Sequence, residues 1–355
     1  MEFSSYILHW YHNEHRDFPW RATKNVYKIW LSEIILQQTR TSQGLSYYTK
    51  FTDIFPTLKD LAITKEEKVL KLWQGLGYYS RARNLHTTAK HIHYNLEGVF
   101  PNNYEELLKL KGVGPYTAAA ISSICFNEKR AAIDGNVYRI LARVFDIHTA
   151  INSTKGIKIF QKLANSLICE TNPGDYNQGL MDLGATICTP KKPDCNNCPL
   201  NSICIARSKK IITKLPIKIK ATKVKERYLN YFCIEHKGQF LMNKREGDDI
   251  WKNLYDFPLK ELHVPNNNNS THDKKITKDI IGGNSFSIKK SVKYKHKLSH
   301  QKLNITIHHI ITNQAPRENN YIKISQKQAL ELPVPKPIEK FFQELFNPIP
   351  LDNER

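Results

Sequence analysis

Two carboxylates of the 355-residue chain stand where they could do acid–base chemistry. Glu33 follows Ile29 by four residues and precedes Leu36 by three, so it interrupts the apolar stripe of an expected helix. Apolar surroundings disfavour a charged carboxylate, and we expect them to raise the pKa of Glu33 toward neutrality, as a general acid requires. A buried ion pair is the alternative interpretation.

The second carboxylate, Asp134, begins the stretch Asp-Gly-Asn-Val ahead of a helical stripe. Asp at such a position is a standard N-cap, because its oxygen accepts hydrogen bonds from the first N–H groups of the helix. The cap interpretation explains the presence of Asp134 without any partner residue. A catalytic role would require a second acid facing it, and Glu33 is the candidate.

A glycine-rich turn precedes Asp134, where residues 110–117 read LKGVGPYT and Tyr116 lies 18 residues before Asp134. Gly112 and Gly114 free the backbone for a tight turn, which delivers N–H groups at the start of the helix expected after it. Such a helix start favours phosphate through hydrogen bonds and through the helix dipole. The turn therefore predicts a grip on a DNA backbone that does not depend on base sequence, and an ordinary turn between helices is the alternative.

Four of the seven cysteines fall within 17 residues, in the pattern C-x6-C-x2-C-x5-C. Four thiolates in one short loop suit either a [4Fe-4S] cluster or tetrahedral zinc, and the spacing does not choose between them. The four are Cys188, Cys195, Cys198 and Cys204.

The elements that must position these residues change character along the chain. Before residue 204 the pattern is almost wholly helical, with a capping box at residues 64–67 and an N-cap at Asn103. After residue 228, short stretches rich in Ile, Phe and Tyr predict strands at 228–234, 240–242, 286–294 and 303–311, and a last helix carries Ile338 and Phe341. Residues 266–269 are four asparagines, for which we expect a surface loop.

The net charge of +20 favours an anionic partner, and 40% apolar residues suffice for packed cores. Residues 205–227 are rich in Lys and Arg and predict an extended basic linker, which either tethers two domains or follows phosphates along nucleic acid. The sequence has neither a long apolar run nor a secretory signal, so we expect a cytoplasmic protein associated with DNA and not with a membrane.

Taken together, the glycine turn, Asp134 and the cysteine spacing resemble the helix-hairpin-helix signature and cluster loop of the endonuclease III superfamily of DNA glycosylases. Within it, the stretches WLSEIILQQT at 30–39, GLGYYSRARNL at 75–85 and DGNV at 134–137 resemble the MutY-type adenine DNA glycosylases. The resemblance covers residues 16 to 204. It implies an all-α, two-lobed catalytic region with DNA in its cleft and one structural [4Fe-4S] cluster.

The resemblance also implies roles for individual residues. Glu33 would protonate a flipped adenine, and Asp134 would stabilise the positive charge that develops on the deoxyribose, which is the logic of glycoside cleavage generally. Asn136 would lie near the attacking water. The remaining residues that match family positions for the adenine pocket or for DNA contacts are Arg16, Trp20, Leu36, Gln38, Thr39, Tyr78, Gly112, Gly114 and Gln178. Trp20 and Tyr78 could instead be core residues.

Tyr116 distinguishes between subfamilies. Glycosylases with lyase activity use an amine to form a Schiff base, and in endonuclease III-like enzymes a Lys stands at this position of the hairpin. We therefore expect a monofunctional enzyme that removes adenine mispaired with 8-oxoguanine or guanine and leaves an abasic site. The alternatives are an endonuclease III-like glycosylase/lyase for oxidised pyrimidines and a non-catalytic DNA-binding protein with a four-cysteine metal site.

The C-terminal part resembles an α+β Nudix domain around residues 251–258, but the acids that would bind Mg²⁺ do not follow, so we do not expect hydrolysis there. In the MutY family the equivalent domain recognises the oxidised guanine, and Leu298, Ser299 and His300 resemble its Phe-Ser-His loop. A plain hairpin tip is the alternative. The expected organisation is a catalytic region at 1–204, a linker at 205–227, a Nudix-like lesion-recognition domain at 228–346 and a tail at 347–355, acting as a monomer on double-stranded DNA.

Overall fold

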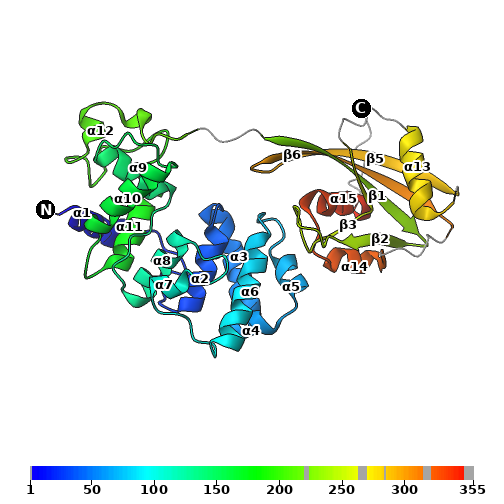
Figure 1. The fold of residues 1–355 in the computed structure, drawn as a ribbon, viewed down its shortest axis with the longest axis horizontal. Helices are drawn as coiled ribbons and strands as arrows, with labels where there is room; N and C mark the ends of the chain where they lie inside the picture. The colour runs from blue at the N-terminus through cyan, green and yellow to red at the C-terminus, as the bar shows by residue number, and fades with distance from the viewer. Residues whose placement is uncertain (1, 220–223, 263–269, 284, 315–320, 348–355) are drawn as a thin grey trace. The chain divides into compact units, whose positions relative to one another are not determined.

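The computed structural model describes residues 2–219, 224–262, 270–283, 285–314 and 321–347, with the backbone alone at 270–273. Its contacts divide the chain into two compact units, labelled element by element in Figure 1. The first unit comprises residues 1–63 and 84–220, and the second comprises residues 64–83 and 221–355. Within the described residues, no helix is long and apolar enough to cross a membrane.

The first unit is built of helices joined by short turns. These are α1 (Phe3–Glu14), α2 (Val26–Leu36), α3 (Thr41–Ile54), α4 (Leu58–Ile63), α6 (Ser80–Asn95, with its first four residues grouped in the second unit), α7 (Tyr104–Leu107), α8 (Pro115–Phe126), α9 (Gly135–Val144), α10 (Thr154–Leu167), α11 (Pro173–Thr186), α12 (Ile205–Ser208) and the 3-10 helix η1 (Ile212–Lys214).

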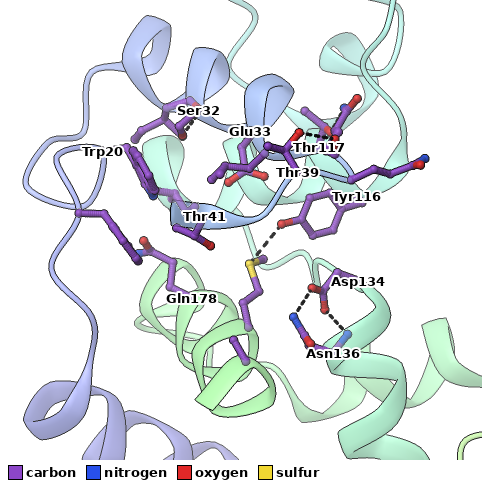
Figure 2. Close-up of a pocket in the computed structure, with 18 of the residues that line it drawn as sticks. Trp20, Ser32, Glu33, Thr39, Thr41, Tyr116, Thr117, Asp134, Asn136 and Gln178 are labelled. Carbon is purple, nitrogen blue, oxygen red and sulfur yellow. Dashed lines mark hydrogen bonds between the residues drawn. The ribbon is translucent and has the colours of Figure 1, made fainter. Parts of the chain in front are cut away.

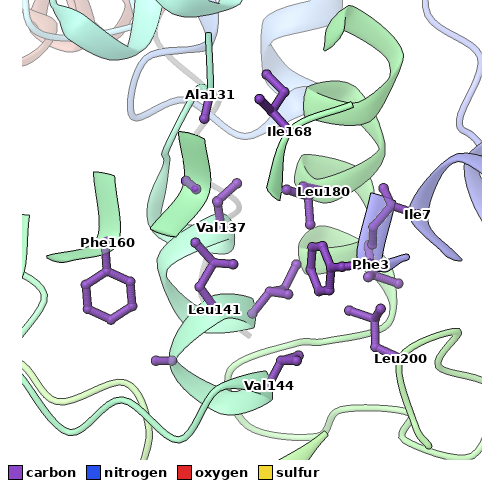
Figure 3. Close-up of a cluster of buried hydrophobic side chains, with 14 of the residues drawn as sticks. Phe3, Ile7, Ala131, Val137, Leu141, Val144, Phe160, Ile168, Leu180 and Leu200 are labelled. Atoms are coloured by element: carbon purple, nitrogen blue, oxygen red, sulfur yellow. The ribbon is translucent and has the colours of Figure 1, made fainter. Parts of the chain in front are cut away.

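A core of apolar side chains from α1, α9, α10 and α11 holds these helices together (Figure 3). In α9 the apolar residues recur at helical spacing, so Val137, Leu141 and Val144 all face the core. Phe3 and Ile7 of α1 reach the same core from the N-terminus. Because Asp134 is the N-cap of α9 and α11 packs against this helix, the core fixes the position of the predicted catalytic carboxylate.

The second unit is a sheet with helices. Its elements are α5 (Glu66–Leu72), β1 (Lys225–His236), β2 (Gln239–Lys244), β3 (Tyr255–Asp256), β4 (Leu259–Leu262), α13 (Ser270–Ile281), β5 (Phe286–Lys297), β6 (Gln301–Thr312), β7 (Ile322–Ser325), α14 (Gln326–Glu331) and α15 (Lys336–Phe346).

The strand order across the described sheet is β3-β2-β1-β6-β5, with β4 paired to β1 and β7 paired to β2. β1 and β6 run parallel, and the other pairs are antiparallel. One face packs against α15, where Phe342 contacts Phe240 of β2 and Phe341 contacts His309 of β6. The opposite face packs against α13, where Ile281 joins a cluster that includes Phe232.

The fold differs from the sequence-based expectations in several places. The capping box at residues 64–67 is wrong, because α5 begins at Glu66 and its N-cap, Lys65, makes no side-chain cap. The expected linker, residues 205–227, is partly structured, since it contains α12 and η1 and its Leu215 is buried in the helical core. The expected strands are present and longer than anticipated. The asparagine run at 266–269 and most of the expected tail lie outside the described residues.

We expect Leu141→Ala to lower the free energy of unfolding of the first unit by about 2 to 5 kcal/mol. Leu141 is fully buried, and the truncation removes apolar contacts and leaves a cavity beneath α9. Urea denaturation measures the change. Ile157→Ala on α10, where the side chain is 48% exposed, is the matched control and should change the free energy by less than about 0.5 kcal/mol. Equal effects of the two substitutions would contradict the assigned core.

Candidate active site and cysteine pocket

A cavity of about 600 Å³ lies among the helices of the first unit, and both predicted carboxylates line it (Figure 2). The sequence-predicted residues that line this cavity are Arg16, Trp20, Glu33, Leu36, Gln38, Thr39, Gly114, Tyr116, Asp134, Asn136 and Gln178. They come from α2, α8, α9, α11 and the segments beside them. The fold therefore assembles in one place residues that are up to 162 positions apart in the chain.

Glu33 reaches the cavity from a helix that is otherwise almost entirely buried. α2 starts at the N-cap Asn25, and eight of its eleven residues, from Tyr27 to Ile35, are buried. The Glu33 side chain itself is only 9% exposed. The pKa of Glu33 is raised to about 7, chiefly by burial and also by the nearby negative charge of Asp134, while Tyr116 and Arg21 act in the opposite direction. The expected direction of the shift is confirmed, and the carboxyl can hold a proton near neutral pH.

Tyr116 stands next to Glu33 at the start of α8. Gly114 is the N-cap of this helix and Pro115 is its first residue, so Tyr116 lies in the first turn of the helix. The Tyr116 hydroxyl donates a hydrogen bond to Met181 Sδ at 3.2 Å (Figure 2). Burial raises the pKa of Tyr116 well above its ordinary value, and the charges of Glu33 and Asp134 add to this. The hydroxyl therefore remains a hydrogen-bond donor at neutral pH.

Asp134 is held rigidly as the N-cap of α9. One carboxylate oxygen accepts the backbone N–H groups of Asn136 and Val137, each at 2.8 Å, and the other accepts Asn136 Nδ2 at 2.8 Å. Burial raises the pKa of Asp134 above its ordinary value, while these hydrogen bonds and Arg139 lower it. The cap interpretation is thus confirmed, and the same carboxylate also lines the cavity.

Asn136 is oriented by a buried arginine. Arg139 Nη2 donates to Asn136 Oδ1 at 2.8 Å and to the Gly184 carbonyl at 2.7 Å, and its Nε donates to the Cys188 carbonyl at 2.7 Å. A Cβ atom at Gly184 would overlap the Asn136 side chain, so glycine permits the close approach of α11 to α9. Arg139 thereby links the start of the cysteine loop to the cap of the helix that carries Asp134.

The wall of the cavity opposite Asp134 depends on Asp182, which sequence reasoning did not single out. Asp182 has no exposed surface and accepts hydrogen bonds from the guanidinium groups of Arg16 and Arg21. Both guanidinium groups also lie over the Phe18 ring, which stacks on Trp20 with ring centroids 4.8 Å apart. Asp182 therefore fixes the loop that presents Trp20 to the cavity.

Several residues that line the cavity were missed by the sequence analysis. Met181 and Ala185 share a face of α11 with Gln178, three and seven residues further on, so helical spacing from Gln178 could have found them. Arg21 directly follows Trp20, but no pattern in the sequence marks it. The others are Phe18, Ile29, Ser32, Gln37, Thr41, Pro115, Thr117, Ile124 and Gly135.

The predicted glycine turn has the expected conformation at Gly112, where φ is +82°. A Cβ atom there would lie 2.7 Å from Asn84 Cβ, so a larger residue would have to displace α6. Gly112 does not line the cavity, whereas Gly114 does. Gly114 is the N-cap of α8, and because glycine has no side chain, the first N–H groups of α8 have no side-chain cap.

The four clustered cysteines line a second, small pocket. None of them is in a disulfide, and Arg143 Nη1 donates to Cys188 Sγ at 3.3 Å. Within the described part of the chain, no three His, Cys, Asp or Glu side chains are arranged around a single-ion site. Four free thiols around one pocket, beside the buried guanidinium of Arg143, are nevertheless a donor set that fits one polynuclear group with a ligand from each cysteine.

The remaining predicted contacts lie in the second unit. Tyr78, Leu298, Ser299 and His300 line one pocket there, together with Trp251 and other residues. Tyr78 has a positive φ of 48° and is 44% exposed, and its hydroxyl is hydrogen-bonded to Ser299 Oγ. Tyr78 is therefore not a core residue, and the structure places it beside the Leu298–His300 turn and not in the cavity of Glu33.

Comparisons with known proteins agree with this architecture. Residues 31–166 match the family model of the HhH-GPD superfamily base excision DNA repair protein, and residues 230–344 match that of the NUDIX domain. Among solved structures, a thermostable thymine-DNA glycosylase matches 58% of this chain and 95% of its own with a TM-score of 0.54 and 33% identity. A non-covalent endonuclease III–DNA complex matches 59% of this chain and 94% of its own with a TM-score of 0.51 at 19% identity, which shows a shared fold.

Relatives along the whole chain decide the family. The adenine DNA glycosylase of Buchnera aphidicola subsp. Schizaphis graminum is 36% identical over 96% of this chain and 98% of its own length. The chain belongs to the adenine DNA glycosylase family. The human family member is 43% identical over 58% of this chain and 40% of its own length.

Family membership confirms three expectations from the sequence: the resemblance itself, the helix-hairpin-helix region followed by a Nudix-like domain, and a hydrolase of the DNA glycosylase class. Excision of adenine in DNA repair follows at the level of the family. In the present chain, Glu33 and Asp134 line the same cavity of the helix-hairpin-helix region.

The buried carboxyl of Glu33 gives a prediction for stability. Its pKa is about 7 when folded against an ordinary value of 4.5, so the folded state binds more protons between these values and loses stability as the pH rises through 7. At pH 8, Glu33→Gln should unfold with a free energy up to about 3 kcal/mol higher than the wild type, and the gain should shrink toward pH 5.

Urea denaturation between pH 5 and pH 8 measures this difference. The matched control is Glu170→Gln, where the side chain is 80% exposed and the stability difference should not vary with pH in this way. A Glu33→Gln protein that is no more stable than the wild type at pH 8 would show that the Glu33 carboxylate is already compensated in the fold.

Proposed function

We propose that this protein excises adenine paired with 8-oxoguanine or guanine from duplex DNA by a monofunctional mechanism that leaves an abasic site. The observation that carries the proposal is the pair of unlike carboxylates in one cavity. Glu33 is buried with its pKa raised to about 7, while Asp134, whose pKa burial also raises, receives three hydrogen bonds that favour its charged form. One group can supply a proton and the other a negative charge at the same pH.

In this mechanism Glu33 is the general acid. Its proton passes to the adenine ring as the bond between the base and the sugar breaks, and the bonding electron pair leaves with the base. The deoxyribose becomes electron-poor, with an oxocarbenium-like charge that the Asp134 carboxylate stabilises. The rigid cap geometry of Asp134 supports this role, because a charge that is already oriented needs no reorganisation during the reaction.

A water molecule completes the reaction. Its oxygen bonds to the sugar carbon and its proton returns to the Glu33 carboxylate, so the enzyme ends in its starting protonation state. Asn136 is held by Arg139 and lines the cavity, which suits it to orient this water. Tyr116 remains protonated and can hold the acid in place by a hydrogen bond.

The residues around the cavity support a monofunctional reaction. Among the described residues that line it there is no lysine, and the hairpin position is occupied by Tyr116. An amine is required for a Schiff base with the sugar, so this cavity supports hydrolysis and not strand cleavage.

The other predicted residues take roles in binding. We infer that Arg16, Trp20 and Gln178 surround the flipped adenine, since they line the cavity with Glu33. Leu36, Gln38 and Thr39 follow at the end of α2, where Gln38 has a positive φ of 55°, and would occupy the gap that the base leaves. The turn at Gly112 and Gly114 would grip the phosphate backbone through its N–H groups.

In the second unit, we propose that Ser299 and His300 contact the oxidised guanine or its phosphate. Both are exposed at the β5–β6 turn, and Tyr78 is hydrogen-bonded to Ser299. Leu298 is half-buried and lacks the aromatic ring of the family's Phe, so it would pack beside the lesion without stacking on it. The sequence-based domain boundaries and a monomeric state remain part of this proposal.

We further propose that Cys188, Cys195, Cys198 and Cys204 hold one [4Fe-4S] cluster. When bound, the cluster would tie the cysteine loop together and supply no step of base removal. The chain's own contribution is Arg143, which donates to Cys188 Sγ and to the carbonyls of Thr189 and Pro190 and so fixes the shape of the loop.

Single-turnover release of adenine from a duplex containing adenine opposite 8-oxoguanine tests the proposed reaction. We expect release by the wild type and by Glu170→Gln, strand breaks only after alkali, and a loss of at least about 100-fold in rate for Glu33→Gln because the proton donor is gone. The rate should fall as the pH rises through about 7, where Glu33 loses its proton.

Adenine opposite thymine serves as the substrate control and should be released far more slowly. Equal release from both duplexes would contradict the mispair specificity. Full activity of Glu33→Gln would remove Glu33 from the mechanism.

Metal analysis tests the cysteine assignment. The wild-type protein should contain iron and acid-labile sulfide in equal amounts, and Cys198→Ser should lose most of both because one ligand is removed. Cys125→Ser is the matched control, since Cys125 lies on α8 away from the cysteine pocket. Zinc in place of iron, or iron retained equally by both variants, would contradict the assignment.

A further inference from the structure

One face of the sheet in the second unit carries a group of exposed lysines. Along β5 the side chains alternate between exposed and half-buried, and alternate residues of a strand face opposite sides of a sheet. The exposed residues nearest the β5–β6 turn are Lys293, Lys295 and Lys297. The half-buried Tyr294 donates to Glu344 of α15 at 2.9 Å, so the lysines lie on the face opposite α15.

The strand register extends this group across the sheet. Lys297 pairs with Lys302 of β6, and Lys293 is aligned through Thr306 and Asn230 with Lys260 of β4. Lys260 and Lys302 are also exposed. We call the five residues Lys260, Lys293, Lys295, Lys297 and Lys302 the lysine face.

The lysine face includes an ion pair between described residues. Among the described residues on this side of β1, β4, β5 and β6 near the turn, the acid is Glu226, whose carboxylate accepts from Lys302 Nζ at 2.6 Å. The β6 residues that pair with Lys295 and Lys293 are the uncharged Asn304 and Thr306. α13 covers the same side further from the turn (Figure 1), where Ile281 of this helix joins a buried cluster with Phe232, Ile234 and Ile310.

We propose that the lysine face binds the phosphate backbone of duplex DNA, continuing the contact that begins at Leu298–His300. This inference rests on the proposed function for the choice of DNA. Three strand spacings and four residues of β5 give the face a width and a length of about 14 Å each. One DNA strand presents about four phosphates over that distance, which the five lysines match in number and sign.

A simpler explanation exists for part of the pattern. β5 is an edge strand, and lysines on edge strands discourage pairing with other chains. That explanation does not cover Lys302, because β6 lies between β1 and β5 within the sheet. The two explanations differ in what happens to DNA affinity when the charges are removed.

The test compares two triple variants of the full chain that remove equal charge. The test variant is K293Q/K295Q/K297Q. The matched control is K237Q/K323Q/K327Q, whose lysines are equally exposed on the β1–β2 turn, β7 and α14. Affinity for undamaged duplex DNA is measured by fluorescence anisotropy between 50 and 200 mM KCl.

Each phosphate contact contributes about 0.9 to the slope of log affinity against log salt. The test variant should therefore have a slope smaller by about 2 to 3. As a result, the ratio of wild-type affinity to variant affinity should fall by up to about 40-fold between 50 and 200 mM KCl. The control should keep the wild-type slope. The pair K260Q/K302Q, which leaves the edge strand unchanged, should reduce the slope by about 1 to 2.

An unchanged slope in both K293Q/K295Q/K297Q and K260Q/K302Q overturns the inference, and aggregation of the first with an unchanged slope assigns its lysines to edge protection. A loss of affinity equal to that of the control triple also overturns it. Single-turnover adenine release at saturating enzyme separates this inference from the proposed function. If the wild type releases no adenine the proposed function fails, while the salt slopes on undamaged DNA still decide the lysine face.

Discussion

The burial of one carboxyl group, that of Glu33, is the constraint on which the active site depends. A charged carboxylate would not be stable among the apolar residues of α2, so the protein holds this group with its pKa raised to about 7. The packing of the surrounding core offsets the free energy that is needed to bury this carboxyl group. As a result, the cavity contains an acid that can release a proton near neutral pH, and the aspartate beside it is held by hydrogen bonds.

The surrounding structure serves to keep these two groups different. Asp134 gains its hydrogen bonds from the cap of α9, and α9 is fixed by the apolar core and by Arg139. Arg139 reaches from Asn136 to the Cys188 carbonyl, so the shape of the cysteine loop is transmitted to the cap. On the other side, Asp182 accepts hydrogen bonds from Arg16 and Arg21, and the ring of Trp20 is held beside the cavity by the same loop.

Much of this arrangement could be predicted from sequence, because the relevant signals are local. The interrupted stripe around Glu33, the cap at Asp134 and the C-x6-C-x2-C-x5-C spacing are each complete within a short segment. Asp182 could not be found in this way, since its partners Arg16 and Arg21 lie more than 160 residues away and nothing near Asp182 marks the pairing. The capping box at residues 64–67 failed because Glu66 and Glu67 accept hydrogen bonds from Asn253 and Lys244, distant residues of the same unit, and these tertiary contacts override the local pattern.

The central claim is that the Glu33 carboxyl is protonated in the folded protein near neutral pH. The most direct measurement is a ¹³C NMR titration of protein labelled at the glutamate side-chain carboxyls, with the Glu33 signal identified by its absence in Glu33→Gln. The account predicts a midpoint near pH 7 for this signal. A midpoint near the ordinary value of 4.5 would contradict it, because Glu33 would then be ionised at neutral pH and could not act as the acid.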